Sequence, residues 1–243
     1  MNEMDKLTIQ GSNFGFSATS LENLGSTEYT LATIVVDTSL SVRPYKEDLL
    51  KMEKAIIESC KKSPRSQNLL VRLLHFNSEG NITEVHGFKL LDEIDTNSYK
   101  PLSCSGATAL VDAVFSGIGA TLTFAKTLID QDYDVNGCVY IITDGEENDS
   151  TLTMNSIKQK LLESQKKEVI ESLTTILIGL TNDNQINSYL QQFKDDCGLD
   201  QFIGVGEATP ENLAKLTGFI SSSISSVSQS LNTGSKSIPL TIN

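Results

Sequence analysis

Five oxygen-bearing side chains in three short segments could together hold one divalent metal ion. They are Asp37, Ser39 and Ser41 in DTSLS, Thr108 in SGAT, and Asp144 in TDGEEN. Carboxylate and hydroxyl oxygens are hard donors, which suit Mg²⁺, Mn²⁺ or Ca²⁺ and suit zinc or copper poorly. Because Mg²⁺ keeps water molecules in its shell, a set with few carboxylates and several hydroxyls favours it. We therefore predict a Mg²⁺ site, with Mn²⁺ or Ca²⁺ as substitutes.

Two of these residues directly follow segments that are typical of buried strands. Asp37 comes after LATIVV (31–36), and Asp144 comes after GCVYIIT (137–143). Continuous β-branched runs of this kind occur in strands that are covered on both faces. In an open parallel α/β sheet, ligands bind beyond the carboxyl ends of the strands. Thr108 can approach the same point from a third side, because its segment leads into a long predicted helix (108–129).

The rest of the chain alternates strands with helices, apart from one early hairpin. The other predicted strands are 69–76, 82–88, 173–179 and 201–205, and the other predicted helices are 44–62, 154–165, 186–193 and 210–231. Alternation of this kind predicts a parallel sheet with helices on both faces. We therefore predict an α/β, Rossmann-like doubly wound fold. Its sheet is mostly parallel and six-stranded, and 82–88 forms one antiparallel edge strand.

The chain divides into three parts by composition. Residues 1–29 are polar and are expected to form a loosely structured arm that can include one edge strand. Residues 30–231 form one domain, and the Ser-rich segment 232–243 is a flexible tail. The N-terminus lacks a basic and apolar targeting signal, and no apolar run approaches about 18 residues. No CxxC pair occurs among the four cysteines. We therefore expect reduced cysteines that serve as packing residues, in a cytoplasmic protein.

The charge of the chain limits its partners. The net charge is −12 at neutral pH. Nonspecific nucleic-acid binding needs a basic surface, so this charge argues against nucleic acid and also against anionic membranes. The sequence contains no information on the oligomeric state.

Taken alone, each candidate ligand has a structural interpretation as a turn or helix-capping residue. Only their joint arrangement favours a metal site over that interpretation. Glu146 and Glu147 follow Asp144, and we expect them to be a solvated charge pair. His75 and His86 lie in or beside predicted strands, and we expect both to be hydrogen-bonded structural residues.

The three segments resemble the loops of the metal ion-dependent adhesion site (MIDAS) of von Willebrand factor A domains. DTSLS resembles the DxSxS signature of that family, SGAT and ITDGEEN resemble its other two loops, and the similarity extends over about residues 31–224. The resemblance implies that Ser39, Ser41 and Thr108 hold the metal directly or through water. It implies that Asp37 and Asp144 act mostly through water and hydrogen bonds. One coordination position would stay open for an acidic side chain of a partner.

The chain departs from the family pattern at Leu40, where the signature usually has glycine. Glycine permits backbone angles that leucine reaches only with strain. Either the loop therefore uses angles that leucine allows, or the metal site is weakened.

The leading hypothesis is a non-enzymatic, metal-dependent module that binds a protein partner through its Glu or Asp. Intracellular relatives in bacteria and phages often act in multiprotein complexes, including stress and defence modules, and the resemblance implies such a role. Two alternatives stay open, namely a Mg²⁺-dependent phosphatase of the haloacid dehalogenase type and a scaffold domain with an empty metal site. The phosphatase chemistry requires a second aspartate two residues after the first, where this chain has Ser39. A nucleotide-binding GxxxxGK[ST] loop does not occur.

Overall fold

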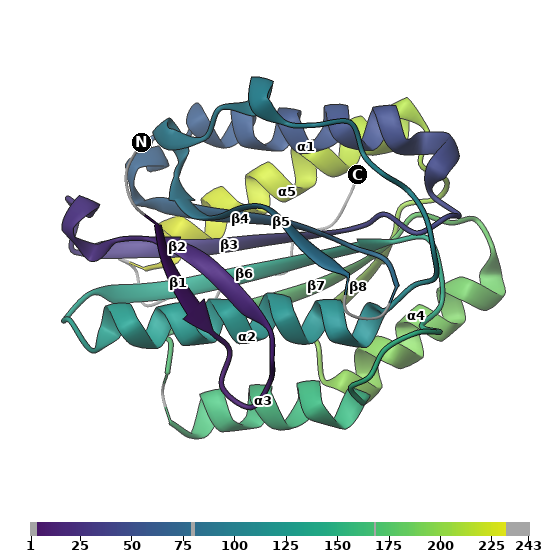
Figure 1. Ribbon diagram of the computed structural model, residues 1–243. Helices are drawn as coiled ribbons and strands as arrows, with labels where there is room; N and C mark the ends of the chain where they lie inside the picture. Colours follow the sequence, from purple (N-terminus) through teal and green to yellow (C-terminus); the bar gives the residue numbers. More distant parts are fainter. Residues whose placement is uncertain (1–3, 79–80, 168, 232–243) are drawn as a thin grey trace.

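One mixed sheet runs through the molecule, and helices cover both of its faces (Figure 1). The computed structural model describes residues 4–78, 81–167 and 169–231. In these residues the sheet has eight strands in the order β1-β2-β5-β4-β3-β6-β7-β8. The strands are β1 (Met4–Thr8), β2 (Gly15–Thr19), β3 (Glu28–Asp37), β4 (Leu69–Phe76), β5 (Ile82–Leu90), β6 (Asp134–Thr143), β7 (Leu173–Gly179) and β8 (Gln201–Gly204).

Helices lie on both faces of the sheet. They are α1 (Lys46–Lys61), α2 (Leu110–Ile129), α3 (Met154–Lys166), α4 (Asn184–Cys197) and α5 (Pro210–Ser230). Figure 1 shows α1 and α5 on one face and α2 and α3 on the other. Along β3, Ile34 packs into the core beneath α1 and α5, while its neighbour Val35 packs into the core beneath α2. The predicted α/β, doubly wound fold is therefore confirmed.

The central strands are parallel, which brings their carboxyl ends to one edge of the sheet. Strand β3 pairs in parallel with β4 on one side and with β6 on the other. Strand β7 then pairs in parallel with β6, and β8 with β7. Asp37 is the last residue of β3, and Asp144 directly follows β6. The two carboxyl groups thus leave neighbouring strands at the same edge.

The sheet differs from the prediction in its strand number and in its edge. Strand β5 is antiparallel to β4, as predicted, but it lies inside the sheet, because β2 pairs with its other side. Strand β1 then pairs antiparallel with β2 and forms the edge. Both added strands come from the segment that was predicted to be a loose arm. The predicted tail, 232–243, lies outside the described residues.

Few apolar residues mark the N-terminal hairpin, because only one of its faces is covered. Phe16 and Ala18 of β2 are buried, as is Ile9 after β1. Gly87 of β5 lets β2 approach closely, since a Cβ at this position would lie 1.9 Å from the carbonyl oxygen of Ser17. Any residue other than glycine would therefore push the two strands apart.

An ion pair between the buried Arg72 and the partly exposed Glu84 links the hairpin to the rest of the sheet. The fully buried Arg72 of β4 donates from Nε to Oε1 of Glu84 over 2.6 Å. The other carboxylate oxygen of Glu84 accepts hydrogen bonds from the backbone N–H and the hydroxyl of Ser17. The Arg72 guanidinium also lies 5.8 Å from the centre of the Phe16 ring. Strands β2, β4 and β5 are therefore joined through one carboxylate.

All four cysteines are unpaired, and Cys60, Cys138 and Cys197 are buried. This agrees with the prediction that they are packing residues. Within the described ranges, no helix is both long enough and apolar enough to cross a membrane.

His86 is a hydrogen-bonded structural residue, as predicted. Its Nδ1 lies 3.0 Å from the carbonyl oxygen of Gly87, and its Nε2 lies 2.8 Å from the hydroxyl of Tyr99. A neutral ring satisfies both contacts when Nδ1–H donates and Nε2 accepts. Burial disfavours the charged ring and lowers the pKa of His86 to about 4 from its ordinary value of 6.5.

This depressed pKa predicts a loss of stability in mild acid. As the pH falls from about 6.5 towards 4, the unfolded chain binds a proton at His86 that the folded chain does not. The stability contributed by neutral His86 is present above that window and is lost within it, by about 3 kcal/mol at full extent. Urea unfolding of wild type and His86→Gln at pH 4.5 to 7 measures this contribution. Wild type should lose more stability than the variant as the pH falls, and parallel profiles would contradict the prediction.

Candidate metal centre

Asp37 is buried at the end of β3 and is held by two hydrogen bonds. Its Oδ1 accepts the backbone N–H of Ser39 at 2.7 Å, and its Oδ2 accepts the hydroxyl of Thr143 at 2.6 Å. Thr143 ends the neighbouring strand β6. Only 1% of Asp37 is exposed. The carboxylate therefore supports the DTSLS loop from below and places a negative charge beneath it.

A chain of hydroxyl groups connects the DTSLS loop with Asp144. The hydroxyl of Ser39 lies 3.0 Å from that of Ser41, and Ser41 donates to Oδ1 of Asp144 over 2.7 Å. Ser39 is buried and Ser41 is exposed. These contacts join residues that lie far apart in the sequence. Three of the five predicted ligands are thus linked by hydrogen bonds, in the order Ser39, Ser41 and Asp144.

Thr108 brings the third loop to the same place. Its backbone N–H donates to Oδ1 of Asn148 at 2.8 Å, and its carbonyl oxygen accepts the backbone N–H of Asn148 at 3.1 Å. Its Oγ1 lies beside Gly145, 3.8 Å from the position that a Cβ would take there. In the described part of the chain this hydroxyl has no hydrogen-bond partner. Thr108 is not the N-cap of α2, a position that Ala109 occupies.

The backbone of the DTSLS loop also pairs with the segment that leads to Thr108. The backbone N–H of Ser105 donates to the carbonyl oxygen of Thr38 at 3.0 Å, and that of Leu40 donates to Gly106 at 3.2 Å. Gly106 has a φ of +75°, which favours glycine at this turn. Leu40 is not among the described residues with positive φ, so the loop uses angles that leucine allows. The first of the two possibilities left by the sequence therefore holds.

Two acidic residues position the Asp144 loop. Glu147 accepts the backbone N–H of Val111 at 2.7 Å, in the first turn of α2, and also those of Asp149 and Ser150. Asp112, buried in α2, accepts the backbone N–H groups of Thr151 and Leu152. The expectation that Glu146 and Glu147 form a solvated pair is therefore wrong for Glu147, although Glu146 is exposed. The interpretation failed because the partner of Glu147 lies 36 residues away.

The role of Asp112 was not predicted either. The one available signal is an aspartate within an otherwise apolar helical segment. An acidic residue that faces a core needs hydrogen-bond donors, so a buried partner is the expected explanation. Hydrogen bonds in both directions thus link α2 with the loop that follows Asp144. Thr108 precedes α2 and Asp144 begins this loop, so these bonds hold both residues in place.

The electrostatics of the centre are dominated by the burial of its two carboxyl groups. Burial raises the pKa of Asp37 to about 6, although the hydrogen bonds from Thr143 and Ser39 oppose the shift. Burial also raises the pKa of Asp144. A cation between the loops would favour the ionised form of both groups. Within the described ranges, no cluster of three or more His, Cys, Asp or Glu residues could hold a metal.

Similarity to known proteins is found at the level of structure. No protein-family profile and no curated protein matches the sequence. The D319A mutant of the PilB minor pilin from Streptococcus sanguinis superposes with a TM-score of 0.60 and 15% identity, over 90% of this chain and 66% of that one. The pilus adhesin SpaC from Lactobacillus rhamnosus GG superposes with a TM-score of 0.54 and 11% identity, over 87% and 31%.

A third similar structure has an occupied metal site. It is proximal thread matrix protein 1 from the mussel byssus with a zinc-occupied MIDAS motif. It superposes with a TM-score of 0.50 and 16% identity, over 80% of this chain and 45% of that one. This chain thus spans less than two thirds of the length of each of these proteins. At such identities the matches establish the fold, which is von Willebrand factor A-like.

Proposed function

We propose that this chain is a von Willebrand factor A domain that binds a protein partner through a metal ion. Ser39, Ser41 and Thr108 hold the ion directly or through water, while Asp37 and Asp144 support them from behind. The bound metal supplies a positive charge that accepts a Glu or Asp of the partner. Because neutral hydroxyls leave most of that charge in place, the ion attracts a carboxylate more strongly than one surrounded by acidic ligands.

The observation that carries this proposal is the convergence of three loops. Hydrogen bonds run from Ser39 through Ser41 to Asp144, and the Thr108 loop is bound to the Asp144 loop through Asn148. The Oγ1 atom of Thr108 is free for a ligand. An arrangement of hard oxygen donors with one free hydroxyl suits a small divalent cation.

The arrangement supports binding rather than phosphoryl chemistry. A phosphatase of the haloacid dehalogenase type would attack with the first aspartate. Here both oxygens of Asp37 accept hydrogen bonds, and 1% of the residue is exposed. A carboxylate held in this way is poorly placed to attack a phosphate. We therefore propose a module without enzymatic activity and expect no turnover of an aryl phosphate in Mg²⁺.

We propose Mg²⁺ as the ion, with Mn²⁺ or Ca²⁺ as substitutes. The zinc in the MIDAS motif of the mussel protein shows that a site of this class can hold zinc, so the prediction that zinc is unsuitable needs a direct comparison of metals. A role in a bacterial or phage stress or defence complex and a cytoplasmic location stay predictions. The pilin and adhesin among the similar structures are a reason to test partners at a cell surface as well.

The test combines metal titration with partner capture, using Thr108→Val. Valine has nearly the shape of threonine, and the lost hydroxyl has no partner to leave unsatisfied, so folding should be preserved. Calorimetry should show Mg²⁺ binding to wild type and binding at least about tenfold weaker to the variant, because a metal ligand is lost. Ser103→Ala, which removes an exposed hydroxyl from the same loop, should bind as wild type does.

Partner capture should follow the metal titration. Wild type should retain a partner in Mg²⁺ and release it in EDTA, whereas Thr108→Val should retain little in either. If wild type bound no divalent metal, the alternative of a scaffold domain with an empty site would replace this proposal.

Leu40 is expected to contribute to partner binding without affecting the metal. Its side chain is 57% exposed beside the proposed ligands. A partner whose carboxylate reaches the metal would cover it, and burying a leucine contributes about 1.5–3 kcal/mol. Leu40→Ser should therefore weaken partner binding about tenfold or more, while Mg²⁺ affinity stays unchanged.

The matched control for this prediction is Leu162→Ser on α3. Leu162 is the other exposed large apolar residue in the described part of the chain, with 39% exposure. Its replacement should change neither affinity. Equal partner binding by wild type and Leu40→Ser would show that the partner does not cover the loop.

A further inference from the structure

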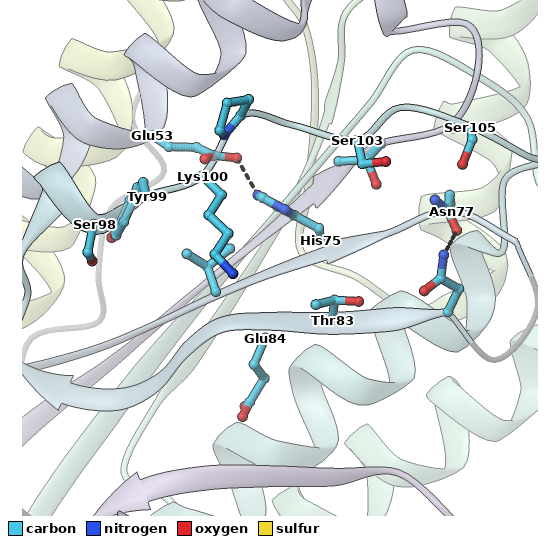
Figure 2. Close-up of a pocket in the computed structure, with 14 residues that line it drawn as sticks. Glu53, His75, Asn77, Thr83, Glu84, Ser98, Tyr99, Lys100, Ser103 and Ser105 are labelled. Carbon is cyan, nitrogen blue, oxygen red and sulfur yellow. Dashed lines mark hydrogen bonds and ion pairs between the residues drawn. The ribbon is translucent and has the colours of Figure 1, made fainter.

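A polar cavity of about 450 Å³ lies next to the metal centre but contains none of its five proposed ligands (Figure 2). It lies between strands β4 and β5 and the segment 98–105. Its walls include Glu53, His75, Thr83, Glu84, Lys100 and Ser103. This volume falls in the range of small-molecule sites. The predominance of hydroxyl and amide groups indicates a polar ligand.

Glu53 gives the cavity a buried group that lacks one hydrogen-bond partner. The residue projects from α1, and none of its side chain is exposed. One oxygen, Oε1, lies 2.8 Å from Nε2 of His75, and Figure 2 shows this contact at the cavity wall. The other oxygen, Oε2, has no partner in the described part of the chain. A buried carboxylate oxygen without a donor is costly, so a donor from outside the chain is expected to complete it.

Lys100 provides the opposite charge at the mouth of the cavity. Its side chain is exposed, and it forms no ion pair with any described residue. The second acidic residue of the wall, Glu84, is already satisfied, because it pairs with Arg72 and Ser17. Figure 2 shows the Glu84 side chain directed away from Lys100 and His75. The cavity therefore combines an inner carboxylate that needs a donor with an outer ammonium group that needs an acceptor.

We propose that this cavity binds a small zwitterion with the size and chemistry of a free amino acid. The ammonium group of the ligand donates to Oε2 of Glu53, and its carboxylate is held by Lys100 at the rim. A charged donor is favoured over a hydroxyl, because hydrogen bonds between ionised groups are about twice as strong as neutral ones. Ser103 and Thr83 of the wall then face the side chain of the ligand.

This site is separate from the proposed metal function, although one residue belongs to both neighbourhoods. Thr38 lines the cavity and stands between Asp37 and Ser39 in the sequence. Its hydroxyl donates to the carbonyl oxygen of Phe76, so Thr38 is not one of the proposed metal ligands. Binding to the cavity can therefore be measured in EDTA, where the metal centre contributes nothing.

Calorimetry with L-glutamine and two matched analogues tests the proposal on the full chain in EDTA. The amine 4-aminobutanamide lacks the carboxylate, and 4-carbamoylbutanoic acid lacks the ammonium group. L-glutamine should bind, and each analogue should bind about tenfold or more weakly, because each loses one charge-assisted contact. L-serine and L-asparagine serve as shorter zwitterions that present the same two charged groups.

Variants then locate the binding site. Glu53→Gln and Lys100→Gln should each weaken L-glutamine binding about tenfold, whereas Lys158→Gln, an exposed lysine of α3, should leave it unchanged. If Glu53→Gln fails to fold, Lys100→Gln and the analogues still decide the question. The proposal is wrong if wild type binds none of the three amino acids, since Oε2 of Glu53 is then only hydrated. It is also wrong if the acid without an ammonium group binds as tightly as L-glutamine, or if Lys100→Gln has no effect.

Discussion

Replacement of Asp37 by alanine is expected to weaken Mg²⁺ binding about 100-fold and to reduce any Mg²⁺-dependent capture of a partner accordingly. Asp37 holds the metal loop through the N–H of Ser39 and is itself held by Thr143. Alanine leaves both donors unsatisfied in a buried place and removes the negative charge beneath the ion. Loss of a supporting group behind a metal ligand typically costs about 10–100-fold in affinity. Because this one supports the loop and also supplies charge, we expect the upper end of that range.

Asp37→Asn separates these two contributions. The amide keeps an acceptor for Ser39 and can still pair with Thr143, so the loop should keep its conformation while the charge is lost. Calorimetric titration of Mg²⁺ should rank wild type above Asp37→Asn, and Asp37→Asn above Asp37→Ala. Asp130→Ala, at an exposed site after α2, controls for the loss of one surface carboxylate. Undiminished Mg²⁺ binding by Asp37→Ala would place the metal elsewhere or exclude it.

The sequence predicted that Asp37 and Asp144 lie at the same edge of the sheet, because both residues stand at strand ends. Two continuous β-branched runs identified the central strands, and Asp37 and Asp144 follow them directly. Strands β3 and β6 pair in parallel. Two residues that each follow one of these strands in the sequence therefore also lie close together in space. Thr108 was harder to place, because it ends a loop rather than a strand. Its assignment depended on the family resemblance.

Residues that hold the loops in place were not predictable in the same way. Glu147 binds the start of α2, and Asp112 binds the segment after Glu147, across separations of 36 to 40 residues. A local pattern shows neither contact, because each partner is a backbone N–H whose position is set by the fold. At Leu40 the prediction and the structure differ in the opposite way. The family pattern has glycine there and suggested backbone strain, but Leu40 does not have a positive φ. Sequence spacing thus predicted which loops lie together but not the contacts that arrange them.

The N-terminal hairpin was not predicted, because its apolar pattern is weak and the residues that hold it lie far along the chain. Strands β1 and β2 are short, and most residues of β1 are exposed, so the apolar alternation that reveals strands is weak. Their place in the sheet depends on Gly87 and on the ion pair of Arg72 and Glu84, which lie far along the chain. This dependence leads to the second large effect that we predict.

Arg72→Met is expected to lower the free energy of unfolding by about 3–5 kcal/mol, because it leaves the Glu84 carboxylate without its buried partner. The methylene groups of methionine can replace the stem of Arg72 but cannot donate to Oε1 of Glu84. Ser17 would then be bound to an uncompensated charge. Urea unfolding should show the loss, and hydrogen exchange should show reduced protection first in residues 4–19. Loss of protection in this segment first would indicate that the ion pair holds the hairpin to the sheet.

A double-mutant cycle with Glu84→Gln tests whether the two residues act as a pair. Each single change leaves one charged group unpaired, whereas the double variant Arg72→Met/Glu84→Gln leaves no net charge in the site. The double variant should therefore lose clearly less stability than the sum of the two single losses. Lys126→Met breaks an ion pair with Asp130 whose side chains are 61% and 56% exposed, and it should cost no more than about 1 kcal/mol. Additive losses in the cycle would mean that Arg72 stabilises the sheet through packing on Phe16 instead of through Glu84.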